Sequence, residues 1–170
     1  ASIGGKTGFD LPEGKNLIGS FHPPKLVLVD PSLLLTLSDR DLRSGMAEVV
    51  KHGIIADPES FAFCANGTDW VNKNLEDVVK RAMAVKIHII EEDPYEKGIR
   101  ATLNLGHTVG HAVELVSGFK LTHGESVAIG MAVEAAYAVR VGVAVRGVDE
   151  AIESTLSTLG LPTRIPGELS

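Results

Sequence analysis

From Ser38 onward, apolar residues recur at intervals of three and four, and this periodicity constrains the fold of the 170-residue chain more than any other feature. Such spacing places the apolar side chains on one face of each of a series of α-helices. Residues 74–93 form the longest periodic segment, and Pro94 ends it. The sequence therefore predicts a mainly α fold, a multihelical bundle that occupies residues 38–170.

Helix signals divide this region further. Ser38, with Asp41 three residues later, resembles a capping box at the start of a helix. Asp57-Pro58 starts a short helix that we expect to end at Gly67. Further helices are expected in the histidine-rich stretch that starts at Asn104, over about 125–141, and near 148–159, with an irregular or short extended connection at 95–102.

The first 37 residues have a different pattern. Residues 1–24 alternate glycine, proline and single apolar residues, which indicates turns and short strands or a hairpin. Lys25–Asp30 has the apolar, β-branched character of a short buried strand, ended by Pro31. We therefore expect two parts, a β-hairpin and strand segment at 1–37 and a helical part at 38–170.

Composition excludes several classes of protein. The net charge of -6 argues against nucleic acid or an anionic membrane as the main partner. The single cysteine rules out an internal disulfide framework, and no apolar run is long enough to cross a bilayer. We expect a soluble cytoplasmic protein.

Histidines cluster in one stretch of the sequence. His107 and His111 are four residues apart, so a helix places both imidazoles on one face, and His123 follows after a break at Gly118. Glu48 adds a carboxylate from an apolar run, although Lys51, one turn later, could pair with it instead. Three imidazoles and a carboxylate indicate a metal site, a cluster of bases, or both. His52 is expected at the surface.

Cations near these residues favour an anionic ligand. Lys6 and Lys15 are flanked by glycines, which let a backbone approach a phosphate closely. Lys51, Lys86, Arg100 and Asn104 lie on elements that lead to the histidines, and together they could bind a phosphate or carboxylate. The alternative from a different class is a non-catalytic helical interaction domain whose histidines are core residues.

Four sequence blocks carry a family resemblance. GGKTGFDLPEGKNLIGSFHPP, GMAEVVKHG, EEDPYEKGIRATLNLGHTVGHAVE and THGESVAIGM occur in the order and spacing that resemble 3-dehydroquinate synthase. The resemblance implies an NAD- and zinc-dependent lyase that cyclises 3-deoxy-D-arabino-heptulosonate 7-phosphate to 3-dehydroquinate with release of phosphate. This is a step of the shikimate route to chorismate and the aromatic amino acids.

The resemblance also assigns roles to residues. It implies metal ligands at Glu48, His107 and His123 for zinc, with cobalt as the alternative metal, and it makes His111 a catalytic residue that faces the substrate. The implied substrate-binding residues are Lys6, Asn16, Lys51, Lys86, Arg100, Asn104 and His111, of which Lys51, Lys86, Arg100 and Asn104 are also implied to be catalytic. The implied NAD-binding residues are Lys6, Lys15, Leu33, Leu34, Leu35 and Thr36.

Two rivals share the same superfamily. Another sugar phosphate cyclase would act on a different phosphorylated sugar, and a related metal-dependent alcohol dehydrogenase would typically use an aspartate where this chain has Glu48. The resemblance further implies an α/β nucleotide-binding domain before Ala1 and a lysine-bearing segment after Ser170. We therefore expect a fragment that is inactive alone, and a homodimer for the longer polypeptide.

Overall fold

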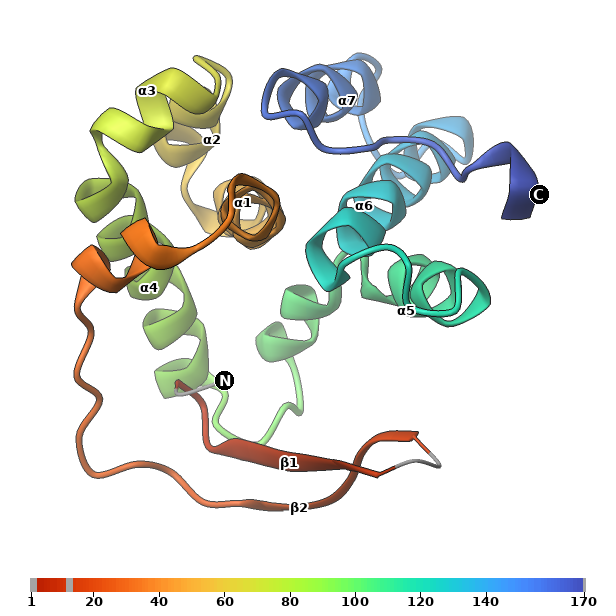
Figure 1. Cartoon of the computed structure of the whole chain (residues 1–170). Coiled ribbons are helices and arrows are strands. Elements are labelled where there is room, and N and C mark those ends of the chain that lie inside the picture. Colours follow the sequence, from red (N-terminus) through yellow and green to blue (C-terminus); the bar gives the residue numbers. More distant parts are fainter. Residues whose placement is uncertain (1–2, 12–13, 170) are drawn as a thin grey trace.

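A computed structural model describes residues 3–11 and 14–169 as a helical body with a two-stranded hairpin on one side (Figure 1). The helices are α1 (Asp39–Ala56), α2 (Pro58–Cys64), α3 (Thr68–Lys73), α4 (Leu75–Glu92), α5 (His107–Val116), α6 (His123–Arg140) and α7 (Val148–Thr158). Short 3-10 helices lie at η1 (Pro31–Thr36), η2 (Ile99–Asn104) and η3 (Gly167–Leu169). The predicted multihelical bundle is confirmed, whereas the division of the chain at residue 37 stays a prediction.

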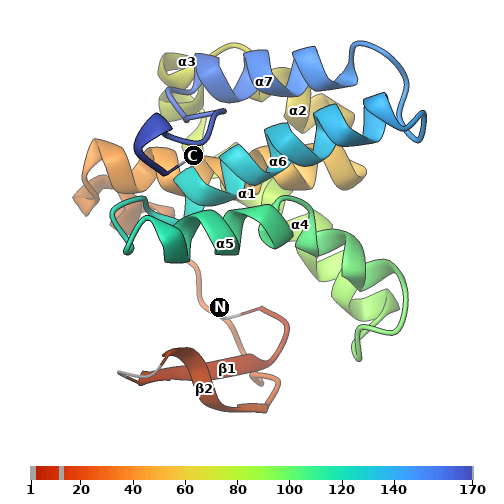
Figure 2. The same cartoon turned by 90° about the vertical axis from the view of Figure 1, so that its right-hand side faces the viewer.

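The core forms where α1, α6 and α7 meet. Val50 of α1, Val127 and Met131 of α6, and Leu156 of α7 are fully buried in one apolar cluster. Burial of a side chain of this size contributes about 1.5–3 kcal/mol. Figure 2 shows α5 and α7 on opposite sides of α6. Helix α6 therefore packs against α5, α1 and α7 and is the central helix of this part of the fold.

Helices α5 and α6 approach each other closely because glycines line their contact. A Cβ added at Gly110 would lie 3.0 Å from the Ser126 oxygen, and one added at Gly130 would overlap the carbonyl oxygen of Gly106. The backbone of α6 is what approaches Gly110 and Gly106. The sequence pattern placed Gly106 inside the helix, but the structure does not. Its φ of 78° is left-handed, and α5 begins one residue later.

The predicted hairpin is confirmed. Strands β1 (Lys6–Leu11) and β2 (Gly14–Phe21) are antiparallel, with Lys6 opposite Phe21 and Phe9 opposite Ile18. In Figures 1 and 2 the hairpin lies beside the helical body, not within it. Phe9 is 67% exposed, so the hairpin contributes little to the core.

The prediction of a buried strand at Lys25–Asp30 is wrong for this chain. These residues have no regular structure, and Leu28 is 87% exposed. A strand requires a neighbour that satisfies its backbone hydrogen bonds, and across residues 3–11 and 14–169 the hairpin forms the only sheet.

Two local predictions are also corrected. The short helix expected after Asp57 is α2, but it ends at Cys64, before Gly67, and Gly67, with a φ of 86°, is the N-cap of a further helix, α3, that the sequence pattern did not indicate. The connection expected to be irregular at 95–102 includes most of η2.

At the start of α1, Ser38 accepts a hydrogen bond from the Asp41 backbone N–H, as its capping pattern predicts. Within the part of the chain that the structure describes, no helix combines the length and apolarity needed to cross a membrane.

Candidate metal centre and anion pocket

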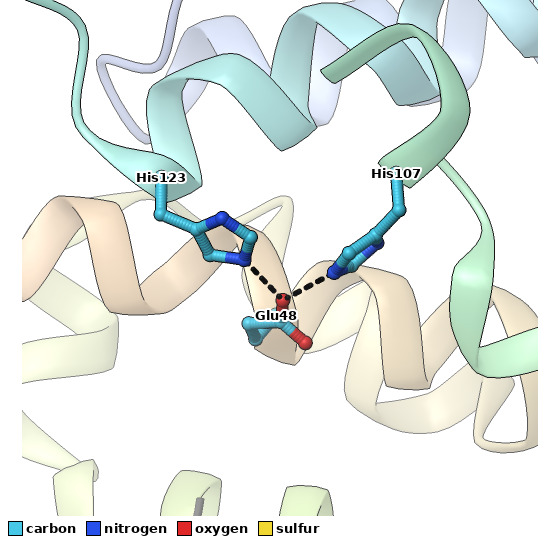
Figure 3. Close-up of side chains that lie close together, drawn as sticks. All are labelled: Glu48, His107 and His123. Carbon is cyan, nitrogen blue, oxygen red and sulfur yellow. Dashed lines mark ion pairs between the residues drawn. The ribbon is translucent and has the colours of Figure 1, made fainter. Parts of the chain in front are cut away.

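Three helices each contribute one side chain to a common point (Figure 3). Glu48 lies in the middle of α1, and His107 is the first residue of α5. His123 is the first residue of α6, whose start is held by a capping box between Thr122 and Glu125. The close contact of α5 with α6 therefore places both histidine-bearing helix starts over the same carboxylate.

The distances among these side chains suit ligands of a common metal ion. Glu48 Oε1 lies 3.5 Å from His107 Nε2 and 3.5 Å from His123 Nε2, and all three ligand atoms are within 4.8 Å of one another. Nitrogen and oxygen donors about 2.0–2.2 Å from a tetrahedral zinc are separated by about 3.3–3.5 Å. The residues present thus fit a three-ligand zinc site.

The carboxylate of Glu48 is shared between two neighbours. Its Oε1 faces the histidines, while Oε2 accepts a hydrogen bond of 2.5 Å from Lys51 Nζ. Burial raises the pKa of Glu48, but contacts from His107, His123 and Lys51 outweigh burial and hold the pKa well below its usual range. Glu48 is therefore ionised. Its pairing with Lys51 through Oε2 leaves Oε1 available as a metal ligand.

Ring contacts set the roles of the imidazole nitrogens. His107 Nδ1 lies 3.1 Å from the Leu105 carbonyl oxygen, which can only accept, so Nδ1 carries a proton and Nε2 is the ring nitrogen that faces the point shared with Glu48 and His123. The pKa of His123 is raised, chiefly by its contact with Glu48. Burial lowers the pKa of Lys51, in opposition to Glu48, which raises it.

A cavity of about 560 Å³ opens beside this cluster. The predicted residues that line it are Lys6, Glu48, Lys51, Lys86, Arg100, Asn104, His107, His111 and His123. The structure thus brings together side chains that the sequence spreads over more than a hundred positions. The four cations of the lining outnumber the carboxylates of Glu48 and Glu96, which gives the cavity the character of an anion site.

Part of the cavity wall is already hydrogen-bonded internally. Arg100 is 4% exposed and donates to the carbonyl oxygens of Pro94 (2.7 Å) and Gly4 (3.0 Å), so it joins the N-terminal segment to the helical body. Glu96 accepts from Lys6 and from Asn104 Nδ2 (3.1 Å), which lowers the pKa of Glu96. An anion bound near Lys6 or Asn104 would compete with this carboxylate.

Four of the predicted NAD-binding residues, at positions 33–36, are not among the residues that line the cavity. Leu33, Leu34, Leu35 and Thr36 lie on η1, and Leu35 is 80% exposed. The side chains of Lys15 and Asn16 lie outside what the structure describes, although their backbone belongs to β2. Their proposed roles toward NAD and substrate remain predictions.

His52 is not a surface residue, contrary to expectation. It is 6% exposed and lines the cavity, and neither ring nitrogen has a hydrogen-bond partner among residues 3–11 and 14–169. Burial, and the nearby charge of Lys51, lower the pKa of His52 to about 4, so the ring is neutral near pH 7. The apolar run around it, from Met46 to Ile55, was the signal that this position would be buried.

Two acids of the site were missed from the sequence. Glu96 has a positive φ of 56° in the loop after α4, a conformation that no local pattern indicates. Glu114 is buried at 6% exposure on α5, and its Oε2 lies 3.6 Å from His123 Nδ1. Its position three residues after His111, on the same helix face, could have indicated it.

Fold and site together define a helical metal-binding domain with an anion pocket. Comparison with family models makes the assignment specific: residues 45–170 match the C-terminal domain of 3-dehydroquinate synthase, and residues 1–44 match the N-terminal domain of the same enzyme. The chain belongs to the 3-dehydroquinate synthase family.

Curated relatives agree with this assignment. The 3-dehydroquinate synthase of Symbiobacterium thermophilum is 47% identical over 98% of this chain and 48% of the relative. That of Xanthomonas campestris is 43% identical over 100% of this chain and 49% of the relative. The chain therefore spans about half the length of the curated relatives it matches.

Solved structures of related enzymes have the same fold. A 2-deoxy-scyllo-inosose synthase complexed with carbaglucose-6-phosphate, NAD+ and Co2+ matches 98% of this chain and 48% of its own, with a TM-score of 0.86 and 30% identity. A 2-epi-5-epi-valiolone synthase from Streptomyces hygroscopicus with NAD+ and Zn2+ bound matches 97% of this chain and 48% of its own, with a TM-score of 0.84 and 30% identity.

Proposed function

We propose that this chain supplies the metal- and substrate-binding half of a 3-dehydroquinate synthase. The enzyme would cyclise 3-deoxy-D-arabino-heptulosonate 7-phosphate to 3-dehydroquinate and release phosphate, with NAD and zinc as cofactors. The observation that carries the proposal is the carboxylate of Glu48 at 3.5 Å from two imidazole Nε2 atoms, in the wall of a cavity with four cations. The names of the curated relatives support the reaction.

In this proposal Glu48, His107 and His123 hold the metal. A zinc ion bound there supplies Lewis-acid polarisation of a substrate oxygen. Cobalt is an alternative occupant, because nitrogen and oxygen ligands accept several divalent metals. Together with the two histidines, Lys51 favours the ionised form of Glu48 through its hydrogen bond to Oε2, so the carboxylate stays available as a ligand.

The cations of the cavity would bind the carboxylate and phosphate of the substrate. Lys51 and Lys86 come from α1 and α4, and Lys6 comes from the hairpin, so the charges surround the cavity from different elements. Arg100 and Asn104 would complete the anion site from η2. His111, exposed on α5 one turn after His107, would exchange a proton with the substrate at a ring nitrogen.

The residues proposed for NAD are Lys6, Lys15 and the segment 33–36. Support comes from the related structures, which contain NAD+. The proposal also places the enzyme in the shikimate route, in the cytoplasm, and as a homodimer.

A chimera tests the proposal directly. This chain would replace the matching 171-residue region of the Symbiobacterium enzyme, and phosphate release from 3-deoxy-D-arabino-heptulosonate 7-phosphate would be measured with NAD and zinc. We expect turnover that is abolished by EDTA and by Lys86→Met. A folded chimera that binds zinc and NAD but releases no phosphate would contradict the proposed reaction.

A second candidate reaction deserves the same assay, because the structural match to 2-deoxy-scyllo-inosose synthase has a TM-score of 0.86. That enzyme is complexed with an analogue of glucose 6-phosphate. Turnover of glucose 6-phosphate, without turnover of the heptulosonate, would assign the chain to this other class of sugar phosphate cyclase.

A further inference from the structure

Glu114 is a buried acid whose role the proposed reaction does not explain. It lies on α5 with 6% exposure, in a part of the helix where Gly110 and Val113 are also buried. A buried carboxylate needs a nearby donor or positive charge to offset its lost hydration. The ring of His123 is such a group, with Nδ1 3.6 Å from Glu114 Oε2.

The two nitrogens of His123 face two different carboxylates. Nε2 is 3.5 Å from Glu48 Oε1 on α1, while Nδ1 faces Glu114 on α5. A neutral imidazole has one N–H and one lone pair, so the two sides compete for the proton. Only the form with the proton on Nδ1 leaves Nε2 free to bind a metal.

In His107, a backbone contact determines which ring nitrogen carries the proton. Its Nδ1 faces the Leu105 carbonyl oxygen at 3.1 Å, so its proton is held away from Glu48 by the backbone of its own chain segment. His123 is the first residue of α6, and at the corresponding nitrogen it has the Glu114 side chain. In both rings Nε2 faces Glu48 and Nδ1 faces an acceptor, which is a neutral carbonyl oxygen for His107 and a charged carboxylate for His123.

We propose that Glu114 is a positioning residue that holds the proton of His123 on Nδ1, turns Nε2 toward Glu48 and His107, and strengthens His123 as a metal ligand. A carboxylate behind a histidine ligand fixes the ring and increases its basicity, and loss of such a partner typically weakens metal binding 10- to 100-fold. The inference rests on the proposed metal site. It adds to that site a residue that contacts His123 at Nδ1, whereas Glu48 faces Nε2 of the same ring.

Metal affinity is the first test, with zinc as the probe in competition with a chromophoric chelator. We expect Glu114→Gln to weaken zinc binding about 10- to 100-fold, with one zinc per chain in both proteins. His107→Ala should abolish tight binding, and Glu76→Gln, an exposed acid in the first turn of α4, should bind as the unmodified chain does.

The outcomes separate the two proposals. If the unmodified chain binds no zinc, the proposed metal site fails. If it binds zinc and depends on His107, but Glu114→Gln binds within twofold of it, only the role of Glu114 fails. Two zinc ions per chain would also overturn that role, because a second ion among His111, Glu114 and His123 needs the Nδ1 lone pair.

A second measurement does not depend on the folding of any variant. In the metal-free chain at alkaline pH, long-range 1H–15N NMR of the histidine rings reports which nitrogen carries the proton. We expect the proton of His123 on Nδ1, and a mixture of both forms in Glu114→Gln. A proton on Nε2 of His123 in the unmodified chain would overturn the inference.

Discussion

At the scale of single residues, the cavity depends on polar groups that are buried against one another. Lys51 is 3% exposed and forms its hydrogen bond with Glu48, while Arg100 donates to backbone carbonyls. Such groups are costly to bury unless they are paired. His52 is the exception, because both of its ring nitrogens are buried and lack a partner in the described ranges.

We expect His52 to make the chain sensitive to acid. Its pKa falls from an ordinary value of 6.5 to about 4 in the folded state, mainly through burial. Above pH 6.5 the ring is neutral in the folded and the unfolded state, so its protonation does not affect stability. As the pH falls from 6.5 to 4, the unfolded chain binds a proton first, and the free energy of unfolding decreases. The loss amounts to about 3 kcal/mol at most.

His52→Phe should remove most of this loss and leave stability at pH 8 unchanged or higher by roughly 1 kcal/mol, because two unsatisfied nitrogens disappear. Urea unfolding at a series of pH values from 8 to 4 would measure both effects. His88→Phe is the matched control, since the His88 side chain is 74% exposed on α4. Equal pH dependence in His52→Phe and the unmodified chain would refute the assignment.

At the scale of elements, the position of α5 is determined by α6. Gly106 precedes α5 and offers no side-chain cap, and Glu134 of α6 takes that role. Its carboxylate accepts hydrogen bonds from the backbone N–H groups of Gly106 (2.7 Å) and Val109 (3.4 Å). A negative charge at a helix N-terminus is favourable, and here it also fixes the first residue of α5, which is His107.

Glu134→Gln should therefore lower the free energy of unfolding by about 1–2 kcal/mol. Equilibrium denaturation in urea would measure the change. Glu91→Gln, at an exposed position of α4, should stay within about 0.5 kcal/mol of the unmodified chain. If the two variants are equally stable, Glu134 does not act as a cap.

The contact between α5 and α6 predicts a larger effect at Gly130. A Cβ there would overlap the Gly106 carbonyl oxygen, a backbone atom that cannot move without displacing α5. We expect Gly130→Ala to destabilise the chain by about 3 kcal/mol or more. Gly45→Ala is the control, because a Cβ at this helical position of α1 meets nothing within 4 Å and Ala favours helix by up to about 1 kcal/mol. Comparable thermal midpoints for the two variants would contradict this account of the packing.

At the scale of the whole molecule, the candidate metal ligands join three helices that form the body of the fold. Glu48 comes from α1, His107 from α5 and His123 from α6 (Figure 3). An ion bound by all three stabilises only the folded chain, because the unfolded chain does not bring these residues together.

Zinc should therefore raise the melting temperature. Free zinc at about 100 times its dissociation constant adds about 2.7 kcal/mol, which corresponds to about 5–10 °C for a chain of this size. Calorimetry with zinc and with EDTA would measure the shift. His107→Ala should show no shift, and an unmodified chain whose midpoint does not respond to zinc would count against the site.

The sequence by itself determined most of the helices and their approximate limits, and it identified Glu48, His107, His111 and His123 as candidates for one site, because helical periodicity, caps and a spacing of four between His107 and His111 are local properties. The division of these candidates into metal ligands and a substrate-facing histidine came from the family resemblance. Tertiary structure decided what depends on neighbours. It set His107 and His123 over Glu48 with His111 at the rim, buried His52, and left Lys25–Asp30 without a partner strand. The physical reason is that burial, ring orientation and strand pairing are decided by atoms brought from distant parts of the chain, which no local pattern encodes.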